Sequence, residues 1–211
     1  MPQIITPEAI ISYPKIFVPE AYDEGDPLEY SAAFIFLEGT NLKEMKDAAV
    51  AAATERWGEK TGAMLASGAL NSPFRTDVEA KGYPEGATFL NARSQRKPGV
   101  VSIYPDPNND GKPTLITDEN AVIAGARVKA ALSVFTYDVK GNKGVSFGLE
   151  HVQLLRAPTE EERLDGRVVV QDTFEADADA VADLSDLEVD NVNESGGAGT
   201  TGTPDDLSDL M

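Results

Sequence analysis

The chain has 211 residues, of which 41% are hydrophobic, which is enough for one folded domain with an appendage. It has no cysteine, which excludes disulfide bonds, cysteine-ligated zinc and a thiol nucleophile. The net charge of −18 is uneven: residues 168–211 hold 12 of the 36 acidic residues and none of the 18 basic ones, so this segment carries −12.

The N-terminal part of the chain has a β-type pattern. Its first ten residues lack the basic start and apolar run of a signal peptide, so we expect a soluble, intracellular protein without membrane contact. Short apolar runs bounded by Pro, Gly and Asp predict strands at residues 13–18, 30–37, 87–93, 99–104, 113–117, 126–139 and 144–155. Together they indicate a small β-barrel or sandwich.

One helix and one hairpin stand out among these strands. Asn41 and Glu44 have the spacing of a capping box, and apolar residues then recur at helical spacing up to Trp57. A Gly-rich connection, residues 58–73, follows. The strands at 126–139 and 144–155 are joined by KGNKG, whose Gly and Asn residues are expected to supply the positive φ of a turn.

From Val168 onward the composition changes to Asp, Glu, Ala, Gly, Thr and Ser. Such a segment cannot bury enough apolar surface to offset its chain entropy. We therefore expect a folded domain over residues 1–167 and a disordered acidic tail over residues 168–211. The tail ends in carboxylates followed by an apolar tip, and the residues expected to bind a protein partner are Asp205, Asp206, Leu207, Asp209, Leu210 and Met211.

Little in the chain predicts catalysis. His151 lies inside a predicted strand, and the sequence indicates no nucleophile or carboxylate positioned to act with it, so we expect a structural role for it. DPNNDG at residues 106–111 matches the start of a calcium loop, but Thr117 stands where that loop needs a Glu, and a turn between strands is favoured. A solvated loop is likewise favoured over a metal site for Asp23, Glu24, Asp26 and Glu29. We expect no catalytic residue, metal or cofactor.

Basic and aromatic residues alternate along two stretches. In residues 126–139, one face is apolar and the other carries Arg127, Lys129, Phe135 and Tyr137. Cations that follow phosphates, interleaved with rings that stack on bases, are what binding to single strands requires. Strand aromatics are more often buried, and that reading stays open. The candidate DNA-binding residues are Arg75, Lys81, Tyr83, Phe89, Arg93, Arg96, Lys97, Arg127, Lys129, Tyr137, Lys140, Lys143 and Phe147.

Three segments carry a family resemblance: VKAALSVFTYDVKGNKGVSFGLEHVQLL, SPFRTDVEAKGYPEGATFLNARS and ERLDGR. They resemble a family of tailed-phage single-stranded-DNA-binding proteins, related to podophage replication proteins. The resemblance implies an oligonucleotide-binding (OB) fold, a five-stranded Greek-key barrel with extra strands and a helix. It also implies an acidic tail that contacts replication proteins such as polymerase, primase or helicase. Podophage tails end in an aromatic residue, whereas this chain ends in Leu210 and Met211. The resemblance supports these candidate DNA contacts: Lys81, Tyr83, Arg93, Lys129, Tyr137, Lys140 and Lys143.

These observations predict a sequence-independent single-stranded-DNA-binding protein of a bacteriophage. Its expected roles are to protect single-stranded DNA in replication, recombination and repair, in the cytoplasm of the infected host, and to recruit partners through its tail. The alternative is an acidic DNA mimic or protein-interaction module that binds no nucleic acid, and a metal-dependent nuclease ranks third. Binding of duplex DNA and homodimer formation stay open.

Overall fold

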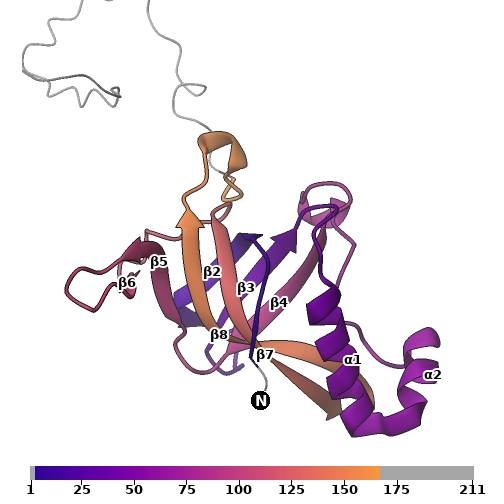
Figure 1. The fold of residues 1–211 in the computed structure, drawn as a ribbon. Coiled ribbons are helices and arrows are strands. Elements are labelled where there is room, and N and C mark those ends of the chain that lie inside the picture. Colours follow the sequence, from indigo (N-terminus) through magenta and orange to yellow (C-terminus); the bar gives the residue numbers. More distant parts are fainter. Residues whose placement is uncertain (1–2, 167–211) are drawn as a thin grey trace, which may run out of the picture. The chain divides into compact units, whose positions relative to one another are not determined.

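Five strands of the protein close into a barrel. The computed structural model describes residues 3–166. Its strands are β1 (Gln3–Ile5), β2 (Ala9–Glu20), β3 (Glu29–Phe36), β4 (Thr88–Ser94), β5 (Gly99–Pro105), β6 (Pro113–Leu115), β7 (Arg127–Val139) and β8 (Asn142–Arg156). Strands β2, β3, β4, β8 and β7 pair in that order, and β7 pairs again with β2 (Figure 1). This order is that of an OB fold, which confirms the predicted fold class.

Three further strands extend the barrel. Strand β1, which the sequence pattern did not predict, pairs with β7, and β5 runs parallel to the second half of β8. Strand β6 pairs with β5 to form a hairpin that projects from the barrel (Figure 1). In the turn of this hairpin, Asp110 and Gly111 have positive φ, and the Asn108 N–H donates to Asp106 Oδ1. The DPNNDG segment is therefore a turn between strands, as predicted.

The long β7–β8 hairpin is confirmed, with a different turn from the predicted one. Lys140 (φ 52°) and Gly141 (φ 84°) occupy the two left-handed positions. Asn142 already belongs to β8, and its side-chain oxygen accepts a hydrogen bond of 2.6 Å from Asn71 Nδ2. The turn thus places a lysine, rather than the expected asparagine, in a conformation that glycine adopts more easily.

Two helices lie on one side of the barrel (Figure 1). Helix α1 (Lys43–Trp57) buries Met45 and two alanines. No capping box forms at its start; Asn41 Oδ1 instead accepts a hydrogen bond from the Lys43 N–H. The expected Gly-rich connection contains a 3-10 turn, η1 (Gly58–Lys60), and a short helix, α2 (Thr61–Ala66). Within residues 3–166, no helix is long and apolar enough to cross a membrane.

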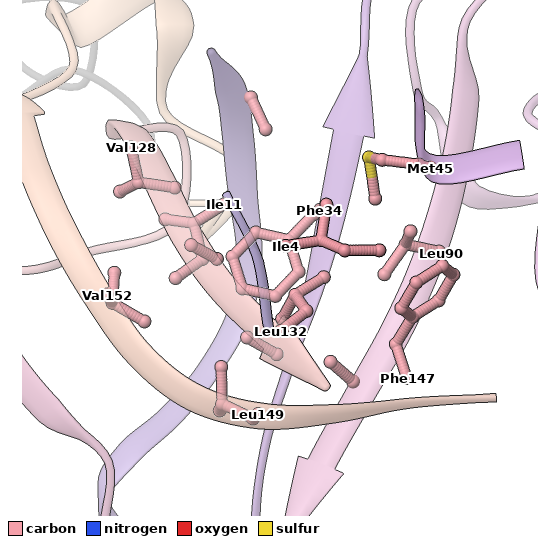
Figure 2. Close-up of a cluster of buried hydrophobic side chains, with 14 of the residues drawn as sticks. Ile4, Ile11, Phe34, Met45, Leu90, Val128, Leu132, Phe147, Leu149 and Val152 are labelled. Atoms are coloured by element: carbon pink, nitrogen blue, oxygen red, sulfur yellow. The ribbon is translucent and has the colours of Figure 1, made fainter. Parts of the chain in front are cut away.

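Apolar side chains line the barrel interior. Phe34, Leu90, Leu132 and Phe147 come from four different strands and are fully buried, and Met45 of α1 packs beside them (Figure 2). The predicted core face of β7 is confirmed, because its alternate residues from Val128 to Val134 point into this cluster. Because these side chains occupy the barrel interior, a ligand can bind only on the outer face of the barrel.

The last described segment is fastened to the barrel. A short 3-10 turn, η3 (Glu160–Glu162), brings the Glu162 carboxylate to Arg156, with N–O distances of 2.6 and 2.7 Å, and to Arg127 at 3.2 Å. These hydrogen bonds, led by that from Arg156, hold the pKa of Glu162 far below its ordinary value. The predicted acidic tail and its six partner-binding residues lie outside the described residues.

Candidate nucleic-acid interface

The outer face of β2, β3 and β4 carries a groove of about 550 Å³, here called the β2–β4 groove. Its lining includes Tyr13, Lys15, Glu20, Tyr22, Asp26, Glu29, Ser31, Arg75, Lys81, Asn91 and Arg93. The strand register explains why these residues meet: Lys15 pairs with Ser31, and Ser31 pairs with Arg93, so the three side chains form a row across the sheet. In OB folds this face and its adjoining loops bind oligonucleotides.

Cations and carboxylates are mixed in the β2–β4 groove. Lys15 Nζ lies 2.6 Å from Glu20 Oε2, and Arg93 Nη1 lies 3.5 Å from Glu29 Oε2. The groove is thus lined by four cations and three carboxylates, which is less basic than the sequence suggested. Exposed ion pairs of this kind contribute only about 0–1 kcal/mol each, so a phosphate can displace the carboxylate at small cost.

Arg75 is held in a fixed orientation at the edge of the groove. Its guanidinium donates two hydrogen bonds to the Asp77 carboxylate, of 3.1 and 2.6 Å, and lies 5.2 Å from the centre of the Phe89 ring. The hydrogen bond from Arg75 is also the main reason that the pKa of Asp77 is lowered. A planar guanidinium held in this way suits phosphate recognition, because little side-chain entropy is lost on binding.

Two exposed tyrosines lie at the groove. Tyr13 is 63% exposed and Tyr22 is 86% exposed. Tyr13 adopts a φ of 47°, at a point where the β2–β3 register shifts between Ser12 and Lys15. A left-handed backbone is an outlier for an aromatic residue, and such strain is concentrated at functional sites. The structure therefore presents an exposed ring at the groove at an energetic cost to the fold.

Three of the predicted DNA-binding residues lie together in the groove: Arg75, Lys81 and Arg93. Two predicted aromatic residues are buried instead and do not line the groove. Phe89 is 1% exposed and Tyr83 is 8% exposed, because both pack in a small apolar cluster with Val78 and Ala87. Their rings meet edge to face, with centroids 5.2 Å apart. Burial raises the pKa of the Tyr83 hydroxyl. The predicted stacking roles of Phe89 and Tyr83 are therefore contradicted by their burial.

Phe147 is also wrong as a stacking residue, for a different reason. It pairs with Val134, a residue of the core face of β7, and is fully buried in the barrel interior. Its ring contacts that of Phe74 edge to face at 5.8 Å. Phe147 thus belongs to the structural core, and Ser146 and Gly148 are the neighbours whose positions face outward.

The remaining predicted residues lie outside the groove lining. Tyr137 packs across the β7–β8 hairpin against Gly144, where a Cβ atom would lie 2.4 Å from the tyrosine hydroxyl. Lys143 pairs with Asp138 at 3.6 Å in the same hairpin. The others are exposed: Lys140 in the hairpin turn, Lys129 on β7, and Arg96 and Lys97 between β4 and β5. The structure does not bring these residues together with the groove, and their role in binding stays a prediction.

Arg127 has a structural role in the fold. It is 17% exposed and lies 3.6 Å from Glu8 and 3.2 Å from Glu162, which joins the start of β7 to η3. Arg127 is less exposed than the paired cations of the β2–β4 groove, and it lies outside the groove lining. Its predicted DNA contact stays a prediction.

The residues considered for chemistry have structural places. His151 Nδ1 accepts a hydrogen bond of 3.1 Å from the Gly99 N–H, at the point where β5 joins β8. The acidic residues from Asp23 to Glu29 lie in and beside the β2–β3 loop. In the part of the chain that the structure describes, no group of three or more acidic or histidine side chains is arranged to hold a metal ion.

Sequence reasoning missed Tyr13, Lys15, Tyr22 and Asn91 as groove residues. The alternation of Tyr13 and Lys15 in SYPKIF has the same basic–aromatic pattern that was used elsewhere in the chain. Tyr22 lies among the acidic residues of the β2–β3 loop, which drew attention to metal binding instead. These residues come together only because β2 pairs with β3 and β3 pairs with β4. Such pairing joins residues that are far apart in the sequence, so local patterns do not reveal it.

Comparisons with known proteins identify a family and similar folds. A family model described as Enterobacter phage Enc34, ssDNA-binding protein, matches residues 2–185. The single-stranded-DNA-binding protein from bacteriophage Enc34 in complex with ssDNA is 18% identical, with a TM-score of 0.57, covering 74% of this chain and 88% of that chain. A C-terminal truncation of that protein is 17% identical, with a TM-score of 0.58, covering 74% and 87%.

A second phage protein has a similar fold. The crystal structure of gp2.5, a single-stranded-DNA-binding protein encoded by bacteriophage T7, is 14% identical, with a TM-score of 0.54, covering 75% of this chain and 93% of that chain. A search of the curated proteins returned no match. At these identities the structural likenesses establish the shared fold, and the family model adds the family.

Proposed function

This chain belongs to the Enc34 single-stranded-DNA-binding family of phage proteins, and we propose on that premise that it binds single-stranded DNA in the β2–β4 groove without sequence preference. The observation that carries the proposal is the groove itself. It combines four cations with two exposed tyrosines on the face that OB folds use for oligonucleotides.

Phosphates bind in this proposal by exchange. Lys15 and Arg93 are already oriented by Glu20 and Glu29, and an incoming phosphate takes the place of those carboxylates. Arg75 keeps its bidentate contact with Asp77, which uses two of its five N–H donors, and contributes the other three. Because the carboxylates that leave are replaced by phosphates, the net gain comes largely from release of counterions from the DNA.

Bases stack on the exposed rings of Tyr13 and Tyr22. Every base has an aromatic face, so stacking does not discriminate between sequences. Asn91 is the polar, uncharged side chain on β4 that lines the groove beside the cations. Stacking and phosphate contacts together account for binding without base readout.

In the cell, we propose that the protein coats single-stranded DNA during phage replication, recombination and repair in the cytoplasm of the infected host. It does so without catalysing a reaction. Its acidic C-terminal tail is proposed to recruit replication proteins such as polymerase, primase or helicase through its carboxylates and apolar tip. The solved relative in complex with ssDNA supports the DNA-binding part of this proposal.

A titration of the protein with fluorescent oligo-dT at two salt concentrations tests the proposal. With four groove cations, the slope of log K against log salt is expected to reach about −2.8. A DNA mimic would not bind oligo-dT at either salt concentration. Absence of binding at both concentrations would therefore refute the proposal. The same titration with duplex DNA measures preference for single strands, and sedimentation measures whether a homodimer forms.

A further inference from the structure

The tail contains one short sequence twice. Asp-Leu-Ser-Asp-Leu occupies residues 183–187 and again residues 206–210. In each copy two leucines stand three positions apart, and each leucine follows an aspartate. One helical turn formed on binding would place the leucines on the same face, with the carboxylates beside them. A receptor for this sequence needs an apolar groove with a cation at its rim.

The body of the protein has such a groove. It lies between α1, α2 and the segment that precedes β4, has a volume of about 330 Å³, and is here called the α1–α2 groove. Its lining is mostly apolar and includes Val50, Leu65, Phe74 and Val145. Val50 is 48% exposed and Leu65 is 38% exposed, so apolar surface remains open to solvent. The volume is within the range of pockets that hold small ligands.

Lys46 is the charged residue of this lining. Its Nζ lies 5.9 Å from the centre of the Phe74 ring. The neighbouring Asp47 is engaged by Lys43, and within residues 3–166 Lys46 forms no ion pair. The groove therefore offers an apolar slot with one cation that has no carboxylate partner in the described structure. This is the complement of a leucine pair flanked by aspartates.

The β2–β4 groove is a poorer receptor for the same sequence. Three of its four cations already hold carboxylates or are fixed by them, and its lining mixes polar and apolar surface about equally. The lining of the α1–α2 groove, in contrast, is mostly apolar. A leucine pair docked in the β2–β4 groove would cover polar groups without giving them hydrogen-bond partners, which costs free energy, so the leucines favour the α1–α2 groove.

We propose that the α1–α2 groove binds one Asp-Leu-Ser-Asp-Leu copy of the chain's own tail at a time. The first copy begins 17 residues after Gly166 and the second 40 residues after it. For the unstructured tail that the composition predicts, these lengths correspond to root-mean-square spans of about 23 and 35 Å. Tethering at such lengths gives an effective concentration that approaches millimolar, so a weak motif is sufficient.

Two copies and one groove have a functional consequence. While one copy is docked, the other is left for a second receptor, which is the recruitment role given to the tail above. The docking itself depends only on the α1–α2 groove and the tail sequence. It therefore stands or falls independently of DNA binding in the β2–β4 groove.

Spin labelling of the full-length chain tests the proposal. Because the chain has no cysteine, Ser208→Cys and Ser185→Cys each give a single site for a nitroxide. The label is expected to broaden the methyl NMR signals of Val50, Leu65 and Val145. The methyl signals of Ile103 and Leu115, in the β5–β6 hairpin away from the helices, serve as the internal control (Figure 1).

Matched variants separate specific docking from chance contact. Leu207→Ala with Leu210→Ala is expected to abolish the broadening from position 208. For copies of equal affinity it should raise the broadening from position 185 only about 1.3-fold, because the shorter tether already favours that copy. Val50→Glu changes an exposed side chain and is expected to abolish both. Broadening that survives the leucine substitutions, that is uniform, or that centres on Ala33 in the β2–β4 groove would overturn the proposal. A mixture of spin-labelled chains without isotopes and isotope-labelled chains without a spin label tests contact between molecules. Broadening of the α1–α2 groove signals in that mixture would also overturn the proposal, because the tail would then dock on a second copy.

Discussion

Replacing Tyr13 by glycine is expected to weaken DNA binding without weakening the fold. The side chain is 63% exposed at the β2–β4 groove, so its removal costs little packing. Its φ of 47° costs a residue with a Cβ atom about 1–2 kcal/mol, and glycine removes that strain. Glycine also raises the entropy of the unfolded chain, which lowers the free energy of unfolding by about 0.5–1 kcal/mol. The free energy of unfolding of Y13G is therefore expected to equal that of the wild type or to exceed it slightly.

The loss of affinity follows from the loss of one stacked base. Stacking contributes about 1–3 kcal/mol per base, which corresponds to a Kd for oligo-dT raised about 5-fold to 150-fold. Fluorescence anisotropy measures the Kd, and urea unfolding measures the stability of the same samples. Tyr104→Ala is the matched control, because Tyr104 is 69% exposed but lies on β5, outside the groove lining.

Two results would refute this reasoning about Tyr13. An affinity of Y13G equal to that of Y104A would show that the exposed ring does not stack on DNA. A drop of more than about 1 kcal/mol in the unfolding free energy of Y13G would show that the left-handed tyrosine is there for stability instead.

Four further outcomes are expected. Arg93→Ala should lower the magnitude of the salt slope for oligo-dT by about 0.7, because one phosphate contact is lost; an unchanged slope places Arg93 outside the interface. Phe147→Leu should lower the melting temperature while leaving the oligo-dT affinity unchanged, since the ring is buried in the core; a selective loss of affinity contradicts its assignment. Glu162→Gln should lower stability at pH 7, and the difference from wild type in urea unfolding should shrink as the pH falls below 4.5. The pKa of Glu162 is lower in the folded protein than its ordinary value of 4.5, so the ionised carboxylate stabilises the fold above pH 4.5. This stabilisation is lost as the pH falls through the lowered pKa and the carboxylate is protonated. Deleting residues 168–211 should raise oligo-dT affinity most at low salt, because the deletion removes 12 tethered negative charges; equal affinities at low salt contradict this.

Local patterns were sufficient to predict much of the fold. The apolar alternation of Val128, Ala130, Leu132 and Val134 identified the core face of β7, and the short runs bounded by Gly and Pro located the other predicted strands. Strand β1 has only three residues, too few for a periodic signal. The helical turns within residues 58–73 were hidden by Gly58 and Gly62, which lie inside them, because glycine disfavours helices.

The site was harder to predict, because exposure depends on what covers a strand. Phe89 faces outward on β4, as its alternation allows, but it is buried in a small apolar cluster with Val78 and Tyr83. Tyr13 is the opposite case: the irregularity in β2 exposes a ring that a regular strand would have turned elsewhere. A similar shift in β8, where Ala131 pairs with His151 and Leu132 with Leu149, changes the alternation along that strand. Such irregularities have no reliable signature in a single sequence.

A titration of the full-length, isotope-labelled chain with oligo-dT, followed by amide NMR, tests the central claim most directly. If DNA binds in the β2–β4 groove, the amide chemical-shift changes should be concentrated at residues 13–15, 21–31, 75–81 and 91–93. Changes that gather instead around Lys129, Lys140 and Lys143 on the β7–β8 hairpin, with the groove unaffected, would contradict the account.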